Sequence, residues 1–163
     1  MVTLRPYRTD DWPAVRRIYA EGIETGIATF ETEPKPQQTW EGKSVPGSQL
    51  VAEEDGDVIG WALLWPVSDR CAYRGVAEVS VYIAASARGR GVGKALLTAL
   101  NGLSEELGIW TQQAGIFAEN TASIGLHEAC GYRLVGIRER LGCLDGRWRN
   151  IAFMERRSTV VGV

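Results

Sequence analysis

The sequence predicts a mixed α+β fold in which helices cover a sheet with several antiparallel strands. Three observations predict it. Residues 76–84 alternate in polarity, as a half-buried strand does. Residues 91–107 carry an apolar stripe at helical spacing. An Asp-Gly pair at 55–56 lies between apolar runs, which is a strong signal for a β-hairpin, and a second pair at 145–146 predicts another turn.

The first half of the chain begins with a strand and a helix. Alternation predicts a strand at residues 2–7. Thr9, Asp10 and Asp11 offer N-caps for a helix whose apolar face runs from Trp12 to Ile23. The elements expected next are a loop at 27–33, a short helix at 38–43, a turn at 45–49, strands at 50–54 and 58–66, and a polar loop at 67–75.

The second half alternates strands and helices and closes with two strands. Gly108 is suited to the position just after the 91–107 helix. The remaining expected elements are a strand at 112–118, a helix from Asn120 or Thr121 to Cys130, and strands at 132–141 and 148–156.

Composition limits the classes of function. A length of 163 residues fits one domain spanning 1–163. The net charge of −2 argues against a nucleic-acid binder, and no apolar run is long enough to span a membrane. Three cysteines without a CxxC pair, and no signal-peptide pattern, predict a cytoplasmic protein. A single histidine, His127, argues against a histidine-based metal centre.

The segment 88–94 combines glycine with positive charge. It follows the 76–84 strand and opens the 91–107 helix. Glycine lets backbone N–H groups approach a ligand, and a helix N-terminus attracts anions. Of the 18 basic residues 15 are arginine, and Arg88, Arg90 and Lys94 lie here. The segment predicts a phosphate or pyrophosphate site; alternatively, it is only a tight turn with solvated cations.

Two nucleotide-binding patterns fit poorly. A Walker loop needs a glycine where Arg88 stands and a hydroxyl residue where Ala95 stands. A Rossmann loop needs GxGxxG, but Gly89, Gly91 and Gly93 are spaced GxGxG. A nucleotide-binding switch therefore lacks its expected sequence.

The pattern Arg-x-x-Gly-x-Gly, formed by Arg88, Gly91 and Gly93, resembles the pyrophosphate loop of the GNAT acyl-CoA N-acyltransferase superfamily. Residues 77–83 resemble that family's fourth strand, and residues 120–132 resemble its later coenzyme A-contacting helix. Three further segments resemble the phosphinothricin and methionine sulfoximine acetyltransferase branch. They are 29–34, Arg74-Gly75 and 126–132.

The resemblance implies a GNAT fold, with a central, mostly antiparallel, twisted sheet splayed between strands 4 and 5 and flanked by helices. It also implies acetyl-CoA as co-substrate and a homodimer, and the single histidine and the cysteine spacing predict no metal. Asn120 and Ser123 would contact coenzyme A, although either residue also suits a helix cap. The residues expected to bind coenzyme A are Val81, Tyr82, Ile83, Arg88, Gly89, Arg90, Gly91, Val92, Gly93, Lys94, Asn120 and Ser123.

Two residues are candidates for proton transfer. Glu78 precedes the expected pantetheine-binding strand segment and is the candidate general base, directly or through water. Its alternative is a solvated or Arg-paired carboxylate. His127 stands where many superfamily members have a tyrosine acid, and an imidazole can donate or relay a proton. Its alternative is a helix-packed histidine bonded to the backbone.

A small molecule with an α-amine and a carboxylate is the expected acceptor. Arg74 would bind the carboxylate bidentately, with Arg70 and Tyr73 nearby in the loop. Phe30 and Glu31 would line the opposite wall, and Glu78 would also face the acceptor. The alternative is that these are ordinary surface residues. The 43–49 segment is shorter than in the family, which affects the shape of the expected pocket.

Three functions remain open at this point. The resemblance suggests phosphinothricin, methionine sulfoximine or methionine sulfone as the acetyl acceptor. Another amine, such as a peptide N-terminus or an aminoglycoside, is an alternative acceptor. A non-catalytic acyl-CoA-binding module would keep the glycine turn without needing Glu78.

Overall fold

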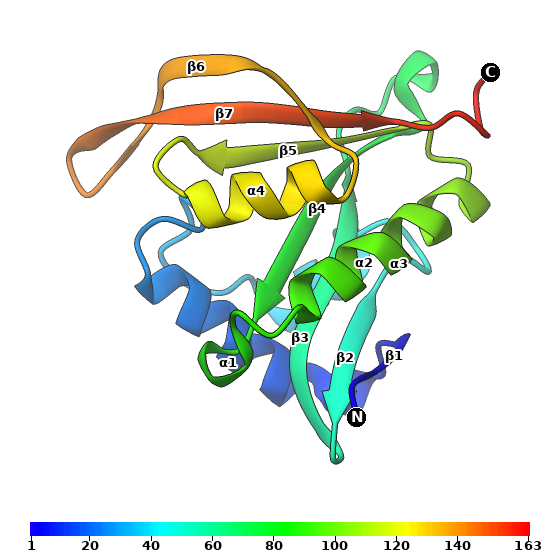
Figure 1. The fold of residues 1–163 in the computed structure, drawn as a ribbon, viewed down its shortest axis with the longest axis vertical. Helices are drawn as coiled ribbons and strands as arrows, with labels where there is room; N and C mark the ends of the chain where they lie inside the picture. The colour runs from blue at the N-terminus through cyan, green and yellow to red at the C-terminus, as the bar shows by residue number, and fades with distance from the viewer.

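Seven strands form one sheet in the order β1-β2-β3-β4-β5-β7-β6 (Figure 1). The computed structural model describes residues 1–163. Only β4 and β5 are parallel neighbours; all other pairs are antiparallel. The elements are β1 Thr3–Pro6, α1 Trp12–Glu24, α2 Gln37–Lys43, β2 Leu50–Glu54, β3 Asp57–Pro66, β4 Val76–Ile83, α3 Val92–Glu106, β5 Thr111–Phe117, α4 Thr121–Ala129, β6 Arg133–Leu144 and β7 Arg147–Arg157.

Both Asp-Gly pairs make tight turns between antiparallel strands. Asp55 and Gly56 have φ of 53° and 88°, and Asp145 and Gly146 have φ of 49° and 76°. Two successive positive φ angles are the geometry of the turn that matches the twist of a two-residue hairpin. These turns join β2 to β3 and β6 to β7, as predicted.

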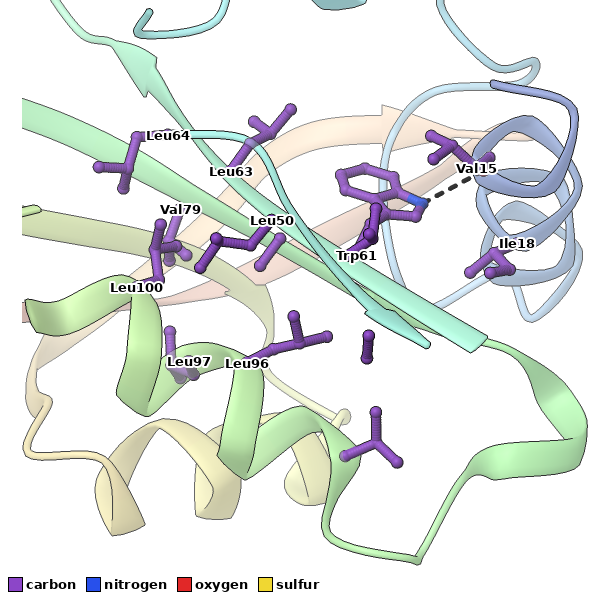
Figure 2. Close-up of a cluster of buried hydrophobic side chains, with 14 of the residues drawn as sticks. Val15, Ile18, Leu50, Trp61, Leu63, Leu64, Val79, Leu96, Leu97 and Leu100 are labelled. Atoms are coloured by element: carbon purple, nitrogen blue, oxygen red, sulfur yellow. Dashed lines mark hydrogen bonds between the residues drawn. The ribbon is translucent and has the colours of Figure 1, made fainter. Parts of the chain in front are cut away.

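The core lies on both faces of β3. Trp61 is fully buried on one face, and its Nε1 donates to the carbonyl of Val15 in α1 at 3.2 Å (Figure 2). On the other face, a Cβ at Gly60 would meet Leu96 of α3 at 3.1 Å. Helices α1 and α3 therefore cover opposite faces of the sheet, because successive strand residues point to opposite sides.

Two local predictions need correction. Helix α1 begins where expected, but no side chain caps it, because Thr9–Asp11 forms a separate 3-10 turn. The carboxylate of Asp11 instead accepts two bonds from Arg5, at 2.8 and 2.9 Å, which hold the pKa of Asp11 below its usual range.

The first of the two closing strands is longer than predicted. β6 continues to Leu144, and its pairing with β7 is irregular between Arg138 and Gly142. The irregularity includes Arg140, which has φ of 47° and donates its backbone N–H to Asn150 Oδ1 at 2.9 Å. A bulge hides its own sequence signal, because an extra residue breaks the alternation.

No helix is both long enough and apolar enough to cross a membrane.

Candidate functional site

The two parallel strands separate shortly after they begin (Figure 1). Their pairing consists of three residue pairs and ends with Glu78 opposite Gln113. β4 then continues to Ile83 and β5 to Phe117 without a strand between them. Backbone groups of alternate residues in a strand point to each side, so those of β4 that face the gap have no strand partner after Glu78.

A cavity of about 890 Å³ occupies this gap. Its size is in the range of sites that hold drug-sized molecules. Four charged side chains line it: Glu31 and Glu78 on one hand, Arg88 and Lys94 on the other. Ile83 is five residue steps along the strand from Glu78, which is about 16 Å at the rise of an extended chain. The cavity therefore suits a long ligand with an anionic end at the glycine turn.

The glycine turn is open to a ligand. Gly89 and Gly91 have φ of 73° and 81°, and a Cβ at either position would meet nothing within 4 Å. No side chain caps α3, so the backbone N–H groups of its first turn lack a capping acceptor. Arg88 and Lys94 are exposed and line the cavity. These features are compatible with a pyrophosphate site, which stays a prediction.

Arg90 is the exception within the predicted turn. It does not line the cavity. Its Nη2 instead contacts both carboxylate oxygens of Glu54 in β2, at 2.7 and 2.8 Å. The local cationic site therefore consists of Arg88 and Lys94, and the structure does not bring Arg90 to it.

The side chain of Tyr82 packs against other aromatic rings. Its ring stacks on Trp61 with centroids 4.6 Å apart, and lies 5.0 Å from the ring of Tyr19. Burial raises the pKa of Tyr82 well above its usual value. Val81, Tyr82 and Ile83 line the cavity together, on the segment of β4 that has left β5.

Glu78 lies at the apex of the gap. Its side chain is exposed, lines the cavity and accepts a hydrogen bond from Gln113 Nε2 at 3.3 Å. No arginine or lysine pairs with Glu78, which removes the ion-pair alternative. The carboxylate therefore lines the cavity with Gln113 as its side-chain hydrogen-bond partner.

His127 is buried but lines the same cavity from α4. Its Nδ1 lies 2.7 Å from the carbonyl of Ser123, so the neutral ring donates its Nδ1–H there. The ring also packs edge-on against Tyr132, with centroids 5.1 Å apart. Burial lowers the pKa of His127, which keeps the imidazole neutral at neutral pH. It therefore holds no spare acidic proton there.

Asn120 has two structural contacts. Its Oδ1 accepts from the backbone N–H of Ser123 at 3.1 Å, which caps α4. Its Nδ2 donates to the carbonyl of Ile27 at 3.2 Å. Asn120 and Ser123 both line the cavity, so the cap lies beside the expected ligand.

Phe30 and Glu31, two of the predicted acceptor-binding residues, lie in the 26–31 segment and line the cavity. Phe30 packs its ring at 4.7 Å and 87° against Phe117 of β5, and both rings line the cavity. Glu31 also lines it and pairs with Lys35.

The structure does not bring the predicted arginines of the 67–75 loop to the cavity. Arg70 lies 5.4 Å over the ring of Tyr73, and Arg74 lies 5.3 Å over the ring of Trp110. Arg74 also donates to the carbonyl of Cys71 at 3.2 Å. None of these three predicted residues lines the cavity in this arrangement.

A family model described as the acetyltransferase (GNAT) family matches residues 10–132. The chain belongs to the GNAT acetyltransferase family. It is an N-acetyltransferase, and its predicted family and fold class are confirmed.

Similar proteins cover nearly all of this GNAT enzyme. It is 39% identical to a phosphinothricin N-acetyltransferase of Alcaligenes faecalis, over 94% of this chain and 81% of that one. It is 30% identical to an L-methionine sulfoximine/L-methionine sulfone acetyltransferase of Pseudomonas aeruginosa, over 94% and 92%.

Solved structures agree with the sequence relatives. A GNAT superfamily phosphinothricin acetyltransferase from Sinorhizobium meliloti, in complex with AcCoA, superposes with a TM-score of 0.88 at 35% identity, covering 99% of this chain and 90% of that one. A ribosomal-protein-alanine N-acetyltransferase from Brucella melitensis gives a TM-score of 0.89 at 33% identity, over 96% and 99%.

Two residues of this GNAT enzyme escaped the sequence prediction. Gln113 donates to Glu78 from the neighbouring strand. Arg149 of β7 is buried, lies 4.4 Å over the ring of Phe117, pairs with Glu119 and donates to the carbonyl of Gly26 at 3.0 Å. An arginine within an expected strand was the one signal for Arg149; Gln113 had none. No group of three or more His, Cys, Asp or Glu side chains is arranged to hold a metal ion.

Proposed function

We propose that this GNAT enzyme, as one domain, transfers an acetyl group directly from acetyl-CoA to the α-amine of a small amino acid-like acceptor. Phosphinothricin, methionine sulfoximine and methionine sulfone are the acceptors that the relatives' names suggest. The observation that carries the proposal is the position of Glu78, at the apex of the gap whose other end is the glycine turn.

The donor would lie along β4. Open glycine backbone, the N-terminus of α3, Arg88 and Lys94 suit its pyrophosphate. The backbone groups of Val81 to Ile83 that face the gap have no partner on β5, and they suit the amide-containing pantetheine arm, which can exchange backbone-type hydrogen bonds with them. Such a ligand directs its thioester toward Glu78, the next charged group along the strand.

Glu78 would remove the proton that blocks attack by the amine. An α-amine has a pKa of about 7.7–8.0, so much of it is an ammonium ion at neutral pH. A positioned general base is worth about 10²- to 10⁴-fold in rate. The Glu31 carboxylate, which lines the cavity and also pairs with Lys35, would add attraction for the ammonium form. His127 would be the second proton-transfer residue, and since its Nδ1–H is donated to the Ser123 carbonyl, a proton relayed by the ring would pass through Nε2.

The carboxylate of the acceptor would need a cationic partner. Phe30 and Glu31 line the cavity, but Arg74 does not. A carboxylate contact with Arg74 therefore requires the 67–75 loop to take another position, and releasing it costs the contact with Trp110.

A screen of acceptors tests the proposal. Release of free thiol from acetyl-CoA is measured with phosphinothricin, methionine sulfoximine, methionine sulfone, a peptide with N-terminal alanine and an aminoglycoside. The amino acid-like compounds are expected to react with the highest kcat/KM. Activity confined to the peptide would support a second candidate function, protein N-terminal acetylation, which the name of the Brucella melitensis protein suggests.

We further propose a cytoplasmic homodimer. The three cysteines are unpaired, as is usual in a reducing compartment. β6 lies at the edge of the sheet, and large apolar side chains are exposed on it and on β7. They are Leu134, Val135, Ile137, Leu141 and Trp148. Light scattering at micromolar concentration is expected to give twice the monomer mass, and Ile137→Glu is expected to halve it; a monomeric parent would contradict the proposal.

A further inference from the structure

One cross-strand pair holds both ends of a segment that lines the cavity. Gly142 of β6 lies opposite Arg149 of β7. Arg149 donates to the carbonyl of Gly26, and Gly142 meets the ring of Phe30. The segment 26–30 is therefore fixed at its start by a hydrogen bond and at its end by a close ring contact.

The contact with Phe30 requires glycine for reasons of space. A Cβ at Gly142 would lie 2.6 Å from Cζ and 2.8 Å from Cε1 of Phe30, closer than such atoms approach. The backbone of Gly142 is not in the left-handed region, so another residue fits there if the ring moves. The glycine thus provides a recess for the tip of the ring, just after the bulge that Asn150 supports.

The direction in which the ring can move is restricted. The perpendicular ring of Phe117 lies 4.7 Å away, and Arg149 covers Phe117 in turn at 4.4 Å. Phe30 and Phe117 both line the cavity. Phe30 is 37% exposed, and the space on its open side includes the cavity that it lines beside Glu31. A ring displaced from Gly142 would move into that open space and leave less room beside Glu31.

We propose that Gly142 determines the length of the acceptor side chain, because the recess at Gly142 keeps the ring of Phe30 out of the cavity. This inference rests on the proposed function for the identity of the acceptor. Gly142 does not line the cavity, and acts through Phe30.

The variant Gly142→Ala tests the inference with acceptors of increasing length. Initial rates are measured with methionine sulfone, ethionine sulfone and buthionine sulfone. Gly142→Ala is expected to lower kcat/KM for the longest acceptor about tenfold relative to the shortest, which is the scale at which a hydrophobic pocket discriminates by length. Gly136→Ala is the matched control on the same strand, because a Cβ there would meet nothing within 4 Å.

A second variant separates a specific contact from general damage. Adding Phe30→Leu to Gly142→Ala shortens the displaced side chain, and is expected to restore the relative rate with the longest acceptor. The affinity for coenzyme A, measured by calorimetry, is expected to stay within about twofold of the parent in all variants. An unchanged length preference, a gain for the longest acceptor, or no restoration by Phe30→Leu would overturn the inference.

Failure of the proposed function gives a different result. The panel also contains linear alkylamines and alanyl peptides of increasing length, and length preference is read within whichever class the parent acetylates. Activity only outside the amino acids would reject the proposed acceptor while the Gly142→Ala comparison still decides the role of the recess. A parent that acetylates no compound in the panel would overturn both.

Discussion

Gln113 Nε2 donates to Glu78 Oε2 at 3.3 Å, at the last residue pair before β4 and β5 separate. The sheet therefore presents the carboxylate at the one place where its parallel strands open. Because Gln113 itself does not line the cavity, its amide orients Glu78 from behind.

Glu78→Gln is expected to lower kcat about 10²- to 10⁴-fold, because it removes the proposed base but keeps the shape of the side chain. The deficit should shrink above pH 8, where the acceptor amine loses its proton without help. Initial rates from pH 6 to 10 measure this. Glu106→Gln, at an exposed glutamate of α3, is the control. Full activity of Glu78→Gln at pH 7 would remove Glu78 from the base role.

Gly91→Ala is expected to weaken coenzyme A binding more than tenfold, since a Cβ would occupy the space where backbone N–H groups meet the pyrophosphate. The substitution also strains a backbone with φ of 81°. Gly56→Ala carries the same strain at φ of 88°, in a hairpin turn that does not line the cavity. Isothermal calorimetry of the two variants separates strain from obstruction; equal affinities would argue against the anion site.

Arg88→Gln and Lys94→Gln are each expected to raise the KM for acetyl-CoA about three- to tenfold, by the loss of a charge-assisted contact with phosphate. Arg90→Gln is expected to change it less than twofold, since that side chain is bonded to Glu54 outside the cavity. Steady-state kinetics at low and high salt measure the difference. A similar increase from all three would mean that general charge, rather than position, attracts the donor.

Protonation of His127 is expected to destabilise the fold. Burial lowers its pKa in the folded state, so below about pH 6.5 the unfolded chain binds more protons, and the free energy of unfolding falls as pH falls. Denaturant titrations between pH 5 and 8 measure this slope. His127→Asn, which can still donate to the carbonyl of Ser123, should flatten it. A slope that persists in the variant would assign the pH dependence to other groups.

The local part of the site could be predicted from sequence. The glycine turn joins a strand directly to a helix, so its neighbours in space are its neighbours in the chain. The same holds for Asn120, whose cap on α4 reaches only three residues ahead. Local chemistry therefore predicts these two helix starts and most of the residues that line this end of the cavity.

The rest depends on partners that are distant in sequence. Arg90 is removed from the turn by Glu54, 36 residues earlier. Gln113 meets Glu78 only because α3 returns the chain to the parallel strand, and Arg149 holds Gly26 across 123 residues. A single sequence contains no signal for contacts between residues so far apart in the chain.

The narrow join between β4 and β5 has a mechanical consequence. Three residue pairs link the two parts of the sheet. Beyond Glu78 and Gln113, β4 and β5 do not pair with each other. A coenzyme A molecule lying along β4 and contacting α4 would bridge the two parts of the sheet where they are not hydrogen-bonded to each other. Because it would bind only the folded chain, it should raise the melting temperature in proportion to the logarithm of its concentration. Hydrogen exchange of the amides at 79–83 should slow with it, while exchange in the β2–β3 hairpin stays unchanged.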